Sequence, residues 1–109
     1  MNAPAKKRQN FKYTVLSNDT WTDVTEAPAS GEVIVVTDIL ASSNQGSSLQ
    51  QFRMSDGSTD TPILTVATSS DRSEQIHFSA ENPIHLKEGY RLQCSASANS
   101  YVSINYYVI

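Results

Sequence analysis

The chain has 109 residues, of which 17% are charged and 39% hydrophobic, and its formal net charge is −3. This length fits one domain, because a second domain would be too small to bury a core of its own. The composition excludes a collagen-like chain, a Pro/Gly-rich disordered chain and a long charged coiled coil, and no apolar run approaches the ~20 residues of a membrane helix.

The first twelve residues form a basic leader ahead of an acidic remainder. They hold four cations and no acid, whereas residues 13–109 hold four cations and eleven acids, a net charge of −7. No apolar segment follows the leader's charges, so a signal peptide is not expected. We predict that residues 1–12 form an extended arm that binds an acidic protein surface through Lys6, Lys7, Arg8, Phe11 and Lys12.

Nucleic acid is the alternative partner for this arm. Three or four cations would bind phosphates weakly and in a salt-sensitive manner. The acidic body opposes such binding, and no aromatic residues alternate with Lys or Arg to form a stacking platform. An acidic protein surface, including another copy of this chain, is therefore the favoured partner.

Apolar and polar residues alternate along most of the chain after the leader. This period of two predicts strands with one side facing solvent. Residues 32–40 are apolar on both sides and predict a central strand that is covered on both. In chain order, the expected strands are residues 11–15, 20–25, 32–40, 49–55, 62–68, 75–79, 84–86, 90–96 and 101–108.

Turn-forming residues such as Ser30-Gly31, Asp56-Gly57 and Glu88-Gly89 separate these strands. Eight or nine short strands with turns about every ten residues are typical of a sandwich or a small barrel. We predict an all-β protein with a single antiparallel β-sandwich, jelly-roll-like, over residues 13–109.

Few side chains suit catalysis. His77 and His85 each lie between apolar neighbours in sequence, so both are expected on solvent-facing sides; a shared metal is disfavoured because no third ligand is indicated. Cys94 lies on the apolar side of its strand and is expected to be a small buried hydrophobe rather than a nucleophile. We predict no enzyme, no catalytic residue, no metal and no cofactor.

Asp38 interrupts the most apolar strand, where a carboxylate is costly unless it accepts hydrogen bonds or the strand reaches the surface. A structural hydrogen bond is the favoured interpretation, and a charge at a subunit contact is the alternative. A polar hairpin turn explains residues 56–60 better than a calcium loop, because they lack the glycine and distal glutamate of an EF-hand.

The expected solvent-facing side of the last strand combines tyrosine with Ser and Asn, a mixture common at recognition surfaces. We mark Tyr101, Asn105 and Tyr107 as a possible recognition surface. The alternative is the solvent-facing side of an ordinary sheet.

Four stretches carry a resemblance to a known family: the strand 33–41 with its Ser/Asn/Gly-rich loop 42–48, the segment 52–57, the stretch 76–90 and the closing strand 101–109. Together they resemble the small all-β virion proteins of tailed bacteriophages. The resemblance implies a structural capsid decoration (cement) protein that stabilises the phage head by binding the major capsid protein through its surface and arm.

The resemblance leaves open an alternative function, a phage tail, neck or fibre component that binds a host receptor or glycan. Either protein would be made in the host cytoplasm and reside in the virion. It would form a homo-oligomer, such as a trimer, with no membrane partner.

Overall fold

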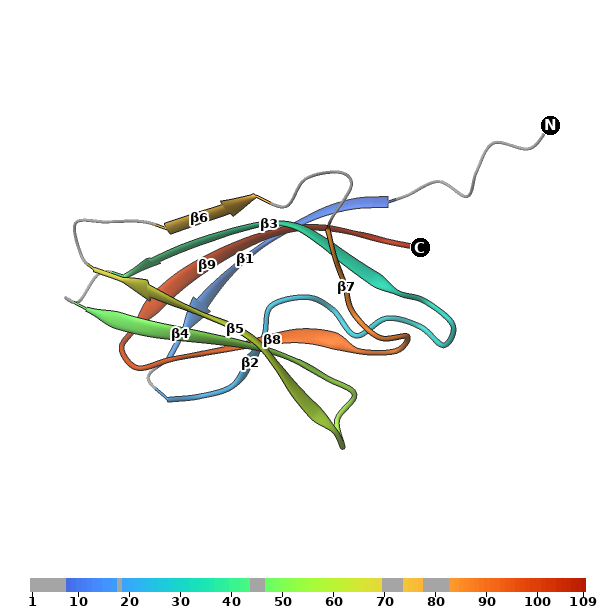
Figure 1. Cartoon of the computed structure of the whole chain (residues 1–109), viewed down its shortest axis with the longest axis horizontal. Helices are drawn as coiled ribbons and strands as arrows, with labels where there is room; N and C mark the ends of the chain where they lie inside the picture. Colours follow the sequence, from blue (N-terminus) through green and yellow to red (C-terminus); the bar gives the residue numbers. More distant parts are fainter. Residues whose placement is uncertain (1–7, 18, 44–46, 70–73, 78–82) are drawn as a thin grey trace.

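The computed structural model describes residues 8–17, 19–43, 47–69, 74–77 and 83–109. This described part holds nine strands, which form two antiparallel sheets packed face to face (Figure 1). The predicted all-β sandwich is therefore confirmed. The strands are β1 (Arg8–Leu16), β2 (Thr22–Asp23), β3 (Ile34–Ser43), β4 (Ser48–Ser55), β5 (Asp60–Thr68), β6 (Glu74–His77), β7 (Ile84–His85), β8 (Arg91–Ala96) and β9 (Ser100–Val108).

The two sheets differ in their strand order. The first has the order β1-β9-β3-β6, with β7 also paired to β3, and the second has the order β2-β8-β4-β5. Consecutive strands such as β8 and β9 thus belong to different sheets, and most neighbours within a sheet are distant in sequence. This order leaves β1 and β5 as the long strands at sheet edges.

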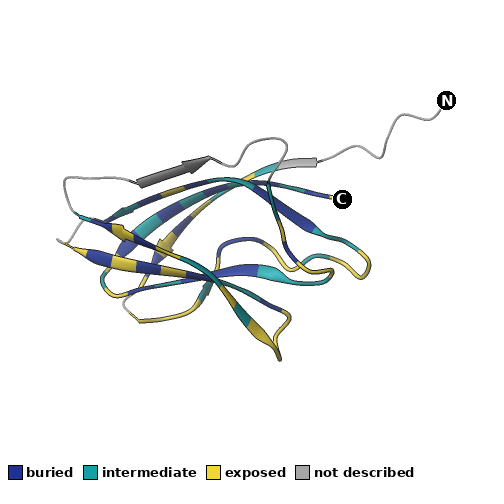
Figure 2. Cartoon of the chain, in the orientation of Figure 1, coloured by how far each residue is buried: buried dark blue, intermediate teal, exposed yellow. Residues whose placement is uncertain are grey.

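The core lies between the sheets and follows the alternation seen in the sequence. In β9 every second residue is buried, from Ser100 to Val108, and the residues between them are only partly buried (Figure 2). Burying a large aliphatic or aromatic side chain contributes about 1.5–3 kcal/mol, so this layer is the main source of stability. Its largest fully buried apolar members include Leu16, Ile34, Ile39, Phe52, Leu92 and Ile104.

Strand β1 begins at Arg8 and pairs with β9 along its whole length, from Arg8 opposite Val108 to Leu16 opposite Ser100. Residues 8–12, predicted as part of a free arm, therefore lie in the sheet. The predicted sandwich began at residue 13, five residues later than the observed start of β1. Residues 8–10 have no large apolar side chain, but main-chain pairing with β9 does not require one. Residues 1–7, with Lys6 and Lys7, lie outside the described residues.

Strand β3 departs from the prediction that both of its sides are covered. Residues 34–36 are all buried, but a register shift follows between Val36 and Asp38, where Thr37 is the extra residue. Beyond this bulge Leu40 is exposed while Ile39 and Ala41 remain buried. The bulge restores alternation, so the second half of β3 has a solvent-facing side.

One end of the sandwich is polar inside. The hydroxyl of Ser100 donates to the Ser48 hydroxyl at 3.0 Å, which joins β9 to β4 across the two sheets. The amide nitrogen of the fully buried Gln50 donates to the Ser42 carbonyl at 3.0 Å. Hydrogen bonds of this kind compensate the cost of burying polar groups.

Candidate assembly surfaces

Two long strand edges are open in the described part of the molecule. β1 pairs only with β9, and β5 pairs only with β4. An open edge presents unpaired N–H and C=O groups that can pair with another chain. The strands at the other two edges are much shorter, two residues in β2 and four in β6.

The two open edges lie on opposite flanks of the sandwich. They belong to different sheets: β1 lies against β8, whereas β5 lies against β3 and β6. One flank therefore ends in β1 of the first sheet, and the other ends in β5 of the second. Each copy carries two different edges that face in opposite directions.

The outer side of the first sheet carries an exposed apolar patch. Phe11, Tyr13 and Val15 of β1 are 67%, 54% and 61% exposed, and Leu40 of β3 is 41% exposed. Only three other large hydrophobic side chains are exposed among the described residues, and they are scattered elsewhere. Scattered apolar residues are normal, but a contiguous patch indicates an interaction site.

Pairing between β1 and β9 brings a residue of the predicted arm, Phe11, next to the predicted recognition surface of the last strand. Phe11 lies opposite Asn105, and the rings of Tyr13 and Tyr101 stack with centroids 5.9 Å apart. Tyr101, Asn105 and Tyr107 are partly buried on this outer side.

Alternation predicts that the apolar residues of β1 face the core. Instead Phe11, Tyr13 and Val15 are exposed and Thr14 is buried, so the predicted side of β1 was wrong. For this reason Tyr13, Val15 and Leu40 were not among the predicted site residues.

A hollow of about 190 Å³ lies in this outer side, lined by Phe11, Asp38, Ile39, Leu40, Ser103 and Asn105. The Thr37 hydroxyl contacts Oδ2 of Asp38 at 3.0 Å and the Asn105 carbonyl oxygen at 3.1 Å. Asp38 thus lies on the outer side next to the bulge, within reach of the Thr37 hydroxyl. Whether this carboxylate has a structural role or lies at a subunit contact stays a prediction.

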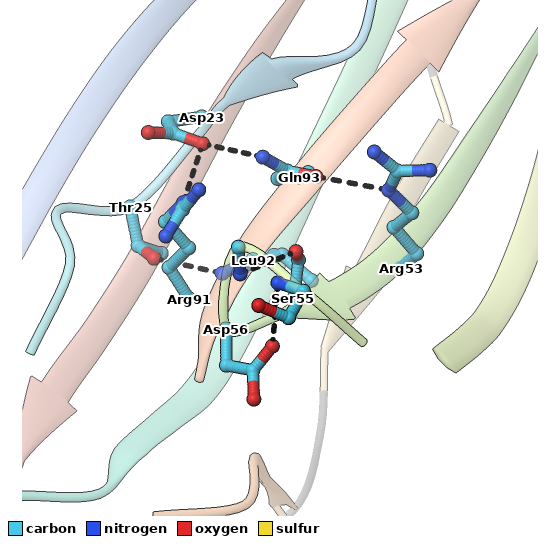
Figure 3. Close-up of polar contacts among 10 residues, drawn as sticks. Asp23, Thr25, Arg53, Ser55, Asp56, Arg91, Leu92 and Gln93 are labelled. Carbon is cyan, nitrogen blue, oxygen red and sulfur yellow. Dashed lines mark hydrogen bonds and ion pairs between the residues drawn. The ribbon is translucent and has the colours of Figure 1, made fainter. Parts of the chain in front are cut away.

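The outer side of the second sheet is organised by charge (Figure 3). Oδ1 of Asp23 accepts hydrogen bonds from Arg91 Nε at 2.9 Å and Gln93 Nε2 at 2.8 Å. Oε1 of Gln93 in turn accepts from Arg53 Nε at 2.9 Å, and Arg53 forms an ion pair with Asp60 at 3.3 Å. These contacts link β2, β8, β4 and β5 in one polar network, which borders a hollow of about 400 Å³ lined by Trp21, Pro62 and Ile63 among others.

Burial and hydrogen bonding act on the pKa of Asp23 in opposite directions. Partial burial raises this pKa, but the hydrogen bonds from Gln93 and Arg91 and the Arg91 charge outweigh it. The pKa of Asp23 therefore lies below 3.8. The carboxylate is charged at neutral pH and holds both partners in place.

Cys94 is fully buried, and desolvation raises the pKa of its thiol to about 12. Burial and the raised pKa both disfavour the reactive thiolate at neutral pH. His85 is exposed, as expected, and the His77 side chain lies outside the described residues. Among described side chains, no group of three His, Cys, Asp or Glu residues could hold a metal ion, and no described helix is long and apolar enough to cross a membrane.

The fold and its edges define a small antiparallel sandwich with two open flanks, and a solved structure shares this fold. It comes from Bacillus endospore appendages, described as a novel family of disulfide-linked pili. The match covers 99% of this chain and 92% of that chain, with a TM-score of 0.50 and 12% sequence identity. No family model matches the sequence, and no curated protein is significantly similar to it.

This match corrects several expectations. The resemblance to phage virion proteins is wrong, because the structural similarity is to an appendage pilus subunit. The match also overturns both expected functions, capsid decoration and the alternative phage tail, neck or fibre component that binds a receptor or glycan. The expected major capsid protein partner, the trimer and the virion location are wrong as well. The four stretches that carried the resemblance are strands and polar loops, which sandwiches of many kinds contain. The expectation of a non-enzymatic protein agrees with the structural match.

Proposed function

We propose that this protein is a non-enzymatic structural subunit that polymerises with identical copies into a fibre, as an appendage on a spore surface. The fold similarity extends over nearly the whole length of both this chain and the pilus subunit. The observation that carries the proposal is the pair of long open edges, β1 and β5, on opposite flanks.

In the proposed fibre, β1 of one copy pairs with β5 of the next. The contact is heterologous, because it joins two different surfaces, and heterologous contacts that do not close into a ring generate open fibres. Added strands gain main-chain hydrogen bonds with little demand on side-chain identity. Because Pro62 has no N–H, the available edge of β5 is mainly residues 63–68.

This fibre is held together without disulfides between its sandwiches. The sequence contains one cysteine, Cys94, and its side chain is buried between the sheets. A bond between the Cys94 residues of two copies would require the sandwich to open. The proposal therefore differs from the matched pili in its covalent chemistry and relies on edge pairing.

The basic leader, residues 1–12, overlaps the open edge strand β1 in sequence. Residues 1–7 precede β1 in the sequence, and residues 8–12 belong to the open edge strand itself. Lys6, Lys7, Arg8, Phe11 and Lys12 are proposed contacts to the copy paired along β1, whose residues 13–109 carry a net charge of −7. If these cations contribute, fibres assemble more slowly as the salt concentration rises, because salt screens exposed charges.

Electron microscopy of the purified chain and of edge-blocked variants tests the proposal. Proline removes one main-chain N–H. Along an edge strand, successive N–H groups point in turn towards the paired strand and towards the open side. Lys12→Pro and Tyr13→Pro therefore sample both directions on β1, and Leu64→Pro and Thr65→Pro do so on β5. Of the two variants on each edge, the one whose circular dichroism spectrum matches that of the wild type is tested, since it is folded. Ala27→Pro, in the exposed β2–β3 loop, is the control.

The wild type and Ala27→Pro are expected to form fibres, and each edge-blocked variant is expected to form none. Small amounts of a blocked variant should also shorten wild-type fibres, because a subunit with one usable edge ends the chain that it joins. Wild-type protein that stays monomeric, or fibres of normal length from folded edge-blocked variants, would overturn the proposal.

A further inference from the structure

The edge contacts use Phe11 at the rim of the first sheet but leave the rest of its outer side unused. This aromatic face consists of the outward-pointing side chains of β1, β9 and the second half of β3, namely Phe11, Tyr13, Val15, Asp38, Leu40, Tyr101, Ser103, Asn105 and Tyr107. Edge pairing extends a sheet in its own plane, so the aromatic face remains exposed along a fibre built in that way.

The composition of the aromatic face is that of an interface core. Asp38 is the only charged side chain among its members, and three of them are tyrosines. Protein interfaces are depleted of charge at their centres and enriched in tyrosine and phenylalanine. The second sheet presents its Arg, Asp and Gln network instead, so the two outer sides are not equivalent.

The area of the aromatic face is sufficient for a specific contact. Two strands of nine residues and six residues of β3 span a surface of roughly 30 Å by 14 Å that narrows to about 20 Å along β3. Two such surfaces packed together remove on the order of 1,000 Å² from solvent, close to the lower limit of specific interfaces. Repetition along a fibre would strengthen such a contact through avidity.

The aromatic face contains both a projecting group and a hollow. Tyr13 is 54% exposed and stacks on Tyr101, whereas the hollow lies beside Phe11, two residues along β1. Residues two apart on a strand are separated by about 7 Å. The small side chain of Ser103 helps to form this hollow, and Asp38 and Asn105 supply polar atoms in its lining.

We propose that the aromatic face binds the aromatic face of a second copy of this chain, with Tyr13 of each copy inserted into the hollow of the other. A two-fold axis between Tyr13 and the hollow makes the contact self-complementary. Asp38 or Asn105 provides a hydrogen-bond partner for the inserted tyrosine hydroxyl. In fibres, the same contact joins two fibres side by side.

Sedimentation equilibrium of the folded β5-blocked variant tests this contact in a protein that cannot elongate through its edges. Leu49→Thr is the matched control: this leucine is 53% exposed but lies on the second sheet. Threonine suits strands, so neither Leu49→Thr nor Tyr13→Thr should remove a strand. A monomer–dimer equilibrium is expected, weakened at least tenfold by Tyr13→Thr and unchanged by Leu49→Thr.

Ser103→Leu separates the proposed insertion from general stickiness. It adds apolar surface to the aromatic face but fills the hollow, so it should weaken the dimer at least tenfold. A stronger dimer with Ser103→Leu, a dimer unaffected by Tyr13→Thr, or a β5-blocked protein that stays monomeric up to about 1 mM would overturn the proposal. If the wild type forms no fibres, only the edge proposal fails, because this dimer is measured independently of elongation.

Discussion

The guanidinium carbon of Arg53 lies 3.9 Å from the centre of the Trp21 ring. Arg53 is held in this position by hydrogen bonding to Gln93 and by the ion pair with Asp60. Trp21 immediately precedes the short edge strand β2, and Arg53 lies on the central strand β4. The contact therefore holds the start of the edge strand against the middle of the sheet. It stabilises the end of the second sheet where main-chain pairing is shortest.

A double-mutant cycle measures this contact. Arg53→Met keeps the chain length without the charge, and Trp21→Leu keeps an apolar side chain without the ring. We expect a coupling free energy of about 0.5–1 kcal/mol from urea unfolding of the four proteins, typical of a partly exposed cation–π pair. Additive effects of the two substitutions would contradict this expectation.

Asp23 is expected to contribute to stability above its unfolded-state pKa and to lose that contribution in acid. Its pKa is lowered in the folded protein, so below about pH 4 the unfolded chain binds more protons than the folded one. The free energy of unfolding therefore falls as the pH drops through this range. Because Asp23 is nearly half exposed, we expect an effect below about 1 kcal/mol.

Asp23→Asn should make the protein less stable at pH 7 and flatten this part of the acid profile. Urea unfolding at pH 7, 4 and 3 compares the two proteins. Parallel profiles for wild type and variant would show that the hydrogen bonds from Gln93 and Arg91 do not influence acid stability.

Cys94 is expected to lower the free energy of unfolding at alkaline pH. Burial raises the pKa of its thiol from 9.0 to about 12, so between these values the unfolded chain loses a proton that the folded chain keeps. Stability therefore falls as the pH rises above 9, by up to about 1.4 kcal/mol per pH unit from this group. Cys94→Ala lacks this slope, although the cavity lowers its stability at every pH.

The difference between the two alkaline profiles isolates Cys94, since tyrosines and lysines titrate in both proteins. A thiol reagent provides a second measurement: the folded wild type should react far more slowly than the urea-unfolded chain. Rapid labelling of folded protein at pH 8 would contradict the burial of Cys94 and, with it, the argument against disulfides between copies.

Gly57 is required by the geometry of the β4–β5 turn. Its φ is +95°, and Oδ1 of Asp56 accepts hydrogen bonds from the N–H groups of Ser58 and Thr59 at 2.8 and 2.6 Å. Gly57→Ala should destabilise the protein by about 1 kcal/mol, because a Cβ is strained at this φ although its nearest neighbour would be Arg91 Nη2 at an uncrowded 4.0 Å. Thermal unfolding should show a loss of roughly 4 °C, and an unchanged melting temperature would show that the turn can relax.

Local pattern alone identified several features correctly. The alternation in residues 102–108 predicts which side chains of β9 are buried, and the apolar phase around Cys94 predicts its burial. Both depend on which side of a strand a residue occupies. In these two strands the apolar side of the period of two is the buried side.

Tertiary structure decided which strands are neighbours. Only the pairing of β1 with β9 places Phe11 opposite Asn105, and only the order of the two sheets leaves β1 and β5 open on opposite flanks. The bulge at Thr37 and the start of β1 at Arg8 likewise depend on partners far along the chain. Alternation separates the two sides of a strand but does not give its neighbours, and in β1 it does not give the side that faces the core, because both reflect the packing of the whole sandwich. The candidate assembly surfaces therefore became visible only in three dimensions.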